Sequence, residues 1–184
     1  MKFESIGTSG ARLIRLEPLS DQRGSFARVW CEDEFRKAGL SFTPVQANVS
    51  ITRGRGTLRG MHFQRMPKPD AKVVRCTRGR IHDVTVDLRG LVASRSDVVE
   101  VELAEDDPTM LYIPAGFAHG FQCLSSVATV EYLMGEAYDP ALSCGFRYDD
   151  PALKIAWPLP AACISDRDLA WPPLSRQGPF SDLS

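Results

Sequence analysis

The residues best suited to chemistry lie in two short runs, Leu58–Gln64 and Lys72–Arg75, whose composition is typical of β-strands. Together they contain one imidazole, His62, and several cations, among them Arg59 and Lys72. An imidazole can take up a proton near neutral pH, and guanidinium and ammonium groups bind phosphate oxygens. If both runs line a barrel, a base and several cations converge on one cavity. The sequence therefore predicts acid–base chemistry on an anionic substrate that carries phosphate.

Strand periodicity predicts which of these side chains share a face. Alternate residues of a strand point the same way, so Arg59 and Met61 are expected on one face and Gly60 and His62 on the other. The alternation is cleanest in Ile81–Leu88, where one face carries two aspartates and the other is mostly aliphatic. That run is expected to have a polar side and a core side.

Many short strands and few helices are predicted for the whole chain. Glu32–Ala38, closed by Gly39, has a helical pattern, and Ser165–Leu169 forms a second short turn. Such a pattern is typical of an all-β sandwich or a closed barrel. The predicted strands are Leu13–Leu16, Val45–Thr52, Val73–Thr77, Ile81–Leu88, Val98–Leu103, Met110–Ile113, Gly120–Leu124 and Val127–Leu133.

Length and charge limit the classes of protein that fit. The 184 residues suit one domain over 1–184, in which a proline-rich segment of about 150–184 wraps the barrel. The net charge is −1 and no long run of one sign occurs, so neither a nucleic acid nor a membrane surface is expected as a partner. There is no apolar stretch of membrane-spanning length and no secretory signal, which predicts a cytoplasmic protein.

The cysteines do not form a recognisable framework. Their number is odd, they are widely spaced, and they contain no Cys-x-x-Cys pair. Both a disulfide scaffold and a zinc cluster are therefore disfavoured, and free thiols are expected. The five are Cys31, Cys76, Cys123, Cys144 and Cys163.

A Pro-x-Gly-x-x-His pattern occurs at Pro114, Gly116 and His119. It resembles the second motif of the cupin superfamily, whose fold is a double-stranded β-helix or jelly roll, and a turn there would deliver His119 into the barrel. Metal-binding cupins also need His-x-His in the first motif, but here His62 is followed two residues later by Gln64. Glutamine is a poor ligand for a transition metal, so the sequence predicts a cupin without metal, and the family resemblance described next implies that no other cofactor is needed.

Several ordered segments together resemble the dTDP-4-dehydrorhamnose 3,5-epimerases and related nucleotide-sugar epimerases, over nearly the whole chain. The segments are Asp21–Gly24, Gln46–Asn48, Leu58–Gln64, Lys72–Arg75, Asp83–Arg89, Ile113–Phe121, Asp150–Pro158 and Ser165–Asp168. The resemblance implies a nucleoside-diphosphate 6-deoxy-4-ketohexose substrate, whose C4 ketone acidifies the hydrogens on C3 and C5. It also implies a homodimer in which the N-terminal strand crosses to the partner.

The resemblance implies catalytic roles for a few residues. His62 is similar to the family's base, with Asp168 holding its other ring nitrogen, although Asp166 competes for that place. Tyr132 stands where the family has the proton donor of the opposite face, and Tyr138 or water are the alternatives.

Further residues are implied in binding. Lys72 is expected to stabilise the enolate oxygen, and Arg59 and Arg23 to anchor the diphosphate. Additional polar contacts are expected from Gln46, Asn48, Tyr138, and His119 with Asp83.

Departures from the family pattern leave the substrate open. Arg28 replaces a usual acidic residue and Ser25 a usual aromatic one, so a CDP- or GDP-linked sugar remains an alternative to dTDP. Leu133 and Val49 replace a frequent lysine and histidine, which leaves inversion at C3, at C5 or at both open. Two other functions compete: a 3,4-ketoisomerase of the same substrates, and a non-catalytic cupin that binds sugar nucleotides.

Overall fold

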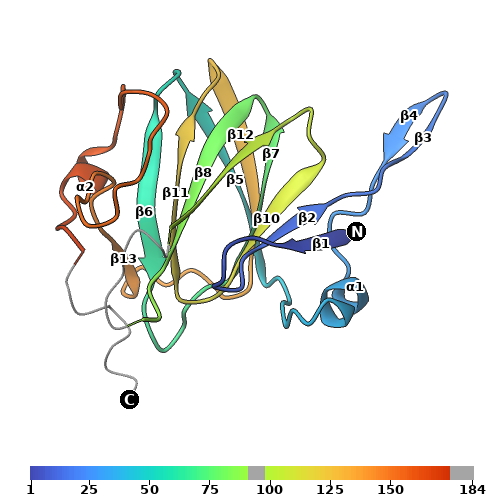
Figure 1. The fold of residues 1–184 in the computed structure, drawn as a ribbon, viewed down its shortest axis with the longest axis horizontal. Helices are drawn as coiled ribbons and strands as arrows, with labels where there is room; N and C mark the ends of the chain where they lie inside the picture. The colour runs from blue at the N-terminus through green and yellow to red at the C-terminus, as the bar shows by residue number, and fades with distance from the viewer. Residues whose placement is uncertain (91–97, 175–184) are drawn as a thin grey trace.

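The computed structural model describes residues 1–90 and 98–174, and this part of the chain is mostly β-structure with two short helices (Figure 1). The elements are β1 (Lys2–Ser5), β2 (Arg12–Arg15), β3 (Leu19–Asp21), β4 (Gly24–Phe26), α1 (Glu32–Lys37), β5 (Gln46–Arg53), β6 (Leu58–Gln64), β7 (Lys72–Arg78), β8 (Arg80–Asp87), β9 (Val98–Ala104), β10 (Thr109–Ile113), β11 (Phe117–Cys123), β12 (Val127–Met134), β13 (Ser143–Gly145) and α2 (Asp166–Leu169). The all-β prediction is confirmed, and every predicted strand overlaps an observed one.

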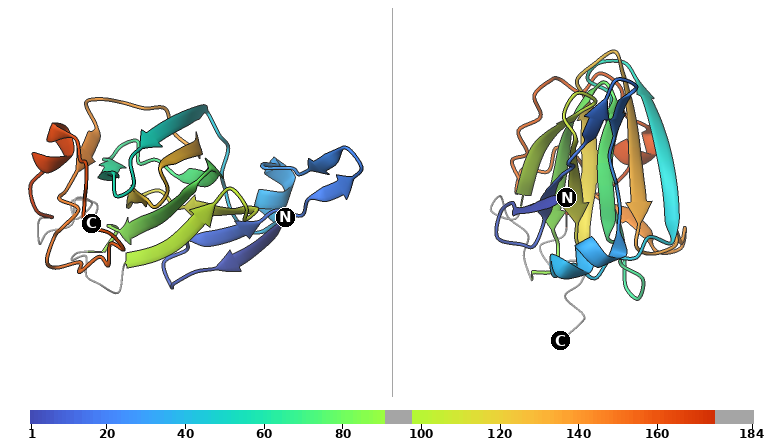
Figure 2. Two further views of the ribbon diagram at one scale, coloured as in Figure 1. Left: turned by 90° about the horizontal axis from the view of Figure 1, so that it is seen from above. Right: turned by 90° about the vertical axis from the view of Figure 1, so that its right-hand side faces the viewer.

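Two antiparallel sheets form the body of the molecule. The larger has the strand order β1-β2-β10-β7-β12-β5, and the smaller has the order β13-β6-β11-β8-β9. The remaining pair, β3 and β4, is a separate hairpin that projects from the body at the end far from α2 (Figures 1 and 2). The strands that the sequence did not predict are β1, β3, β4 and β13, each of only three or four residues.

Apolar side chains from both sheets fill part of the space between them. Leu111 and Val130 come from the larger sheet and Phe117 and Ile81 from the smaller, and all four are almost completely buried. Buried apolar side chains in protein interiors are closely packed, so this cluster forms the floor of the space between the sheets. Polar inward-facing residues of β11 and β12 lie beyond that floor and line a cavity.

The outer faces of the sheets are covered by other parts of the chain. Phe35 of α1 is fully buried on the outer face of the larger sheet. On the smaller sheet, Val84 and Val86 pack under Leu153 and Trp157. From the predicted wrapping segment, Leu153, Ile155, Trp157 and Leu174 pack on this sheet, and 175–184 lies outside the described residues.

The aliphatic face of β8 is thus turned outward and covered by the C-terminal segment, and its polar face is turned into the barrel. Asp83 and Thr85 on that inner face are fully buried. None of the helices in the described residues is both long and apolar enough to span a membrane. The cytoplasmic location stays a prediction.

Candidate active site

A cavity of about 490 Å³ opens between the two sheets beyond the apolar floor. Its walls come from β5, β7 and β12 of the larger sheet and from β6 and β11 of the smaller. Eight of the predicted site residues line it: Gln46, Asn48, Arg59, His62, Lys72, His119, Tyr132 and Tyr138.

Arg59 and His62 line the same cavity, so the prediction that alternation puts them on opposite faces is wrong. The cause is an irregularity in the pairing of β6 with β11. Arg59 pairs with Phe121 and His62 pairs with His119, so four residues of β6 span the same length as three of β11. A β-bulge of this kind shifts the facing of every later side chain by one. Gly120 makes the close approach possible, since a Cβ there would lie 2.8 Å from the Arg59 carbonyl oxygen.

His62 forms a close pair with a carboxylate from the far end of the chain. Its Nε2 lies 2.6 Å from Oδ1 of Asp168, 106 residues away in sequence. Oδ2 of the same carboxylate accepts a hydrogen bond from the backbone N–H of Gly60, and Ser165 caps α2 by accepting from the backbone N–H of Asp168. Asp166, the competing candidate, is exposed. An ionised carboxylate can only accept hydrogen bonds, so Nε2 carries the proton and Nδ1 is the unprotonated nitrogen, which can accept one.

The pKa of Asp168 reflects opposing influences. Burial acts to raise it, but the hydrogen bond and charge of His62, together with the N–H of Gly60 and the contact with Ser165, hold this pKa below its ordinary value. The carboxyl group is therefore ionised throughout the neutral range. An anion fixed beside His62 stabilises the imidazolium that forms when the ring takes up a proton.

A second histidine–carboxylate pair lies beside the first. His119 is the direct cross-strand neighbour of His62, and its Nε2 lies 2.8 Å from Oδ2 of Asp83. Asp83 is completely buried, whereas the side chain of His119 is 11% exposed. Neighbours in an antiparallel pair have Cβ atoms about 5 Å apart, so both imidazoles belong to one wall of the cavity.

Tyr132 enters the cavity from the other sheet. It lies on β12, opposite Asn48 of β5 and Val74 of β7, while His62 lies on β6. Burial raises the pKa of Tyr132, and the Arg59 cation opposes that rise only in part. The phenol is consequently neutral near pH 7 and available as a proton donor. Tyr132 and His62 therefore line the cavity from different sheets.

Polar neighbours orient the remaining predicted binding residues. Arg59 donates from Nε to the Thr52 hydroxyl at 2.9 Å, and among the described residues its terminal nitrogens have no protein partner. The Gln46 amide nitrogen donates to Asn48 Oδ1, and Gln46 Oε1 accepts from the backbone N–H of Tyr138. The bond to Thr52 uses only Nε of Arg59, so the two terminal nitrogens of its guanidinium remain for phosphate oxygens in the cavity.

Arg23 is the predicted site residue that this chain does not bring to its own cavity. It lies in the turn of the β3–β4 hairpin, its side chain is 89% exposed, and it is paired with Asp21. The hairpin and α2 are at opposite ends of the molecule in Figure 1 and in the left view of Figure 2.

Two charged residues of the cavity were not singled out from the sequence. Asp70 lies two residues before Lys72, a spacing that puts both on one side of an extended segment. Arg167 donates to the Ser143 hydroxyl, and its guanidinium carbon lies 5.4 Å from the Trp171 ring centroid. Its position beside Asp168 was visible, but no spacing distinguished it from an ordinary surface arginine.

The glutamine of the first cupin motif has a structural environment. Gln64 is 4% exposed, and its amide donates to the backbone oxygens of Lys68 and Ala137 while its oxygen accepts from the N–H of Asp139. In the described residues, no three His, Cys, Asp or Glu side chains are grouped closely enough to hold a metal ion.

A jelly roll with paired imidazoles and carboxylates on one wall and a phenol on the other defines a sugar isomerase of the cupin class. The chain belongs to the dTDP-4-dehydrorhamnose 3,5-epimerase family, whose sequence profile matches residues 6–176. The predicted cupin fold and the predicted resemblance are both confirmed.

Individual relatives agree with this placement. The chain is 42% identical to the dTDP-4-dehydrorhamnose 3,5-epimerase of Methanothermobacter thermautotrophicus over 183 residues, which cover 97% of each chain. It is 36% identical to the dTDP-4-dehydrorhamnose 3-epimerase of Streptomyces niveus, over 91% of this chain and 81% of that one. The crystal structure of the Bacillus anthracis 3,5-epimerase with TDP and PPi bound has a TM-score of 0.87 and 33% identity, and covers 94% of this chain and 100% of that chain.

Proposed function

We propose that the protein inverts C3 and C5 of a dTDP-linked 4-keto-6-deoxyhexose through an enolate. It acts in deoxysugar biosynthesis, and residues 1–184 form one domain. The observation that carries the proposal is the opposition of a histidine–carboxylate base and a neutral phenol across one cavity. Inversion requires a proton to leave one face of a carbon and another to arrive on the opposite face. Two proton-transfer groups on opposing walls satisfy that requirement.

Each step is assigned to a residue of the cavity. Nδ1 of His62 takes the proton from the carbon beside the C4 ketone, and Asp168 stabilises the resulting imidazolium. The negative charge moves to the C4 oxygen, where the ammonium of Lys72 stabilises it. Tyr132 then delivers a proton to the opposite face. The ketone is the electron sink throughout, so the carbon centre is inverted without any net oxidation.

The diphosphate is proposed to bind at the cationic part of the cavity. Among the described residues, the terminal nitrogens of Arg59 have no protein partner, and Arg167 of α2 lines the same cavity. Two guanidinium forks can hold several phosphate oxygens at once. The relatives named above act on dTDP sugars or bind TDP, which favours thymidine as the nucleoside.

The number of inverted centres is tested by solvent exchange. Incubation of dTDP-4-keto-6-deoxyglucose with the protein in D₂O, followed by NMR, should show deuterium at both C3 and C5. Deuterium at C3 alone would assign a 3-epimerase, the activity named for the Streptomyces niveus relative. The absence of deuterium at either carbon, with CDP- and GDP-linked sugars equally inert, would refute the proposed function, and a 3-keto product would assign a ketoisomerase.

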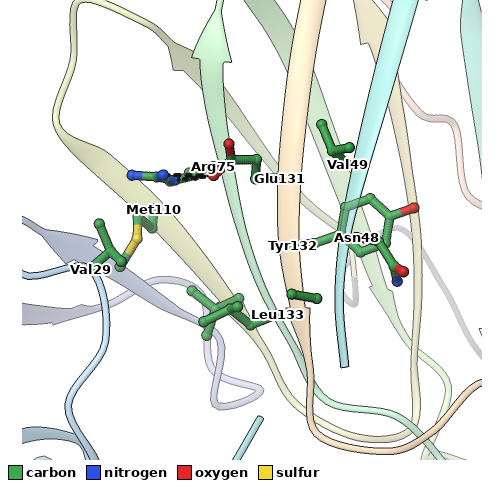
Figure 3. A pocket seen from close by; sticks show the side chains of 10 residues that line it. Val29, Asn48, Val49, Arg75, Met110, Glu131, Tyr132 and Leu133 are labelled. Atoms are coloured by element: carbon green, nitrogen blue, oxygen red, sulfur yellow. Dashed lines mark hydrogen bonds and ion pairs between the residues drawn. The ribbon is translucent and has the colours of Figure 1, made fainter. Parts of the chain in front are cut away.

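We also propose that the protein is a homodimer formed through the outer face of the larger sheet. Val45, Val49 and Ile51 are 61%, 62% and 51% exposed there. A hollow of about 300 Å³ lies beside them, and Figure 3 shows its Arg75–Glu131 ion pair on the other side of β12 from the Tyr132 phenol. Contiguous exposed apolar surface is typical of a protein interface.

The projecting hairpin supports the same arrangement. Leu19 and Phe26 on β3 and β4 are 74% and 71% exposed, which is unfavourable for an isolated chain. A two-fold dimer would cover them and would bring the Arg23 of each protomer toward the cavity of the other. Sedimentation velocity at micromolar concentration should give a dimer for the wild type and a monomer for Val49→Asp. A monomeric wild type would refute the dimer.

A further inference from the structure

Asp70 and Lys72 form a buried ion pair in the wall of the cavity. Lys72 Nζ lies 3.1 Å from Asp70 Oδ2, and the two side chains are 9% and 6% exposed. The other carboxylate oxygen of Asp70 is buried and has no hydrogen-bond partner among the described residues. Lys72 is therefore the one group of the described structure that holds this carboxylate in place.

The charge of Asp70 is unfavourable for binding a diphosphate. Among the charged residues that line the described cavity, Arg59, Lys72 and Arg167 are cations and Asp70 is the single carboxylate. An anion at this position repels the substrate and loses hydration by being buried. A role other than binding the diphosphate must account for it.

The backbone of Ala71 and Lys72 is held by the chain on both sides of β7. The carbonyl oxygen of Ala71 accepts a hydrogen bond from Gly135 at 2.8 Å, and Lys72 is paired in register with Ile113 and Met134. Asp70 therefore presents its short side chain to the lysine from a segment whose following backbone is fixed. A lysine side chain otherwise has four flexible bonds, and its ammonium can adopt many positions.

We infer that Asp70 is a positioning residue that holds the Lys72 ammonium where the enolate oxygen develops. This inference rests on the proposed function. The ammonium lies in an ion pair with Asp70, and an ammonium has three donors, so it can also donate to the oxygen at C4. Fixing the cation before the reaction favours the transition state over the bound ketone, because the charge on oxygen grows only as the enolate forms.

The test compares Asp70→Asn and Asp70→Ala with the wild type, with dTDP-4-keto-6-deoxyglucose as substrate and kcat and KM measured separately. Asp70→Ala should lower kcat on the order of 100-fold, the scale that follows from displacing a reacting group by about 1 Å. Asp70→Asn should lower kcat about tenfold, since a neutral acceptor holds an ammonium less firmly than an anion does. KM should stay unchanged or fall in both variants, because a negative charge leaves the phosphate-binding cavity.

A double-mutant cycle shows whether Asp70 acts through the lysine. In a Lys72→Ala background, Asp70→Ala should change the rate of deuterium exchange less than twofold. The matched control is Asp149→Asn, which removes the carboxylate of an exposed pair with Arg147 at the same two-residue spacing and should leave kcat unchanged. Binding of dTDP and the thermal unfolding temperature are recorded for every variant.

Independent effects of the two substitutions, or a wild-type kcat in Asp70→Ala, would overturn the inference. So would a loss of kcat that is matched by loss of dTDP binding and of folded protein in Asp70→Asn, because that pattern indicates a structural role. A wild type that is inactive on the dTDP sugar would instead remove the proposed function, and this inference with it.

Discussion

Replacing Asp168 by asparagine tests the proposed base most directly. The change keeps the shape of the side chain but removes the charge that Oδ1 presents to His62 Nε2 at 2.6 Å. A hydrogen bond to a charged group contributes about 1.5–3 kcal/mol, which corresponds to about a 10- to 150-fold lower rate if it is lost as the imidazolium forms. This sets the lower end of the expected effect.

The tautomer of the ring adds to that loss. The asparagine amide can donate to Nε2, and His62 would then carry its proton on Nδ1, the nitrogen proposed to accept the substrate proton. Because the base would be blocked in its stable tautomer, we expect kcat to fall further, to about 10³–10⁴-fold below the wild type, the scale seen for a comparable change in a serine protease triad. KM should change little, since Asp168 lies behind the histidine and does not line the cavity.

The assay is initial-rate product formation from dTDP-4-keto-6-deoxyglucose, with the deuterium exchange rate as a second measurement. Asp166→Asn is the matched control, because Asp166 is an exposed carboxylate on the same turn of α2. A rate for Asp168→Asn within threefold of the wild type, or an equal loss in the control, would refute the assigned base.

Three further outcomes are expected. His62→Ala should abolish deuterium exchange at both carbons, and loss at only one carbon would argue against a single shared base. Tyr132→Phe should lower epimer formation about 10²–10⁴-fold, while deuterium exchange on the His62 face persists. Tyr138 is 52% exposed, so Tyr138→Phe should stay within a few-fold of the wild type in both epimer formation and exchange. Because the pKa of Asp168 is lowered on folding, its contribution to stability is complete above the ordinary carboxyl pKa of about 4 and is lost as the pH falls through the lowered value. Urea unfolding of the wild type and of Asp168→Asn measures this contribution as the difference between their free energies of unfolding. The difference should be constant above about pH 5 and shrink in more acidic buffer. A difference that grows on acidification would contradict the assigned ionisation of Asp168.

Strand periodicity predicted most of the fold because burial on one face imposes a period of two. It located β8 and β12 to within a residue or two at each end. It missed β3 and β4, since strands of three residues with exposed side chains have no buried face to reveal them. Which side of β8 faced the cavity also depended on the covering segment around Trp157, a long-range contact that alternation does not contain.

The sequence identified most residues of the site but not how they are arranged, because the arrangement depends on contacts between distant segments. Alternation separated Arg59 from His62, because a bulge depends on the partner strand and on Gly120 there. The pairing of His62 with Asp168 joins residues 106 positions apart, so only resemblance to a family could suggest it. Asp70 was overlooked although its spacing from Lys72 was visible, because nothing in the sequence indicated that the segment before β7 is buried.

The carboxylate behind His62 is supplied by a different part of the chain from the walls that enclose the sugar. Residues 46 to 143 supply nearly all of the cavity lining, and Asp168 comes from a single helical turn that follows. The carboxylate that supports His62 is therefore encoded apart from most of the residues that line the cavity. A descendant of this protein that lost one acidic side chain would keep its affinity for nucleotide sugars, and could evolve into a receptor for them without rebuilding the barrel.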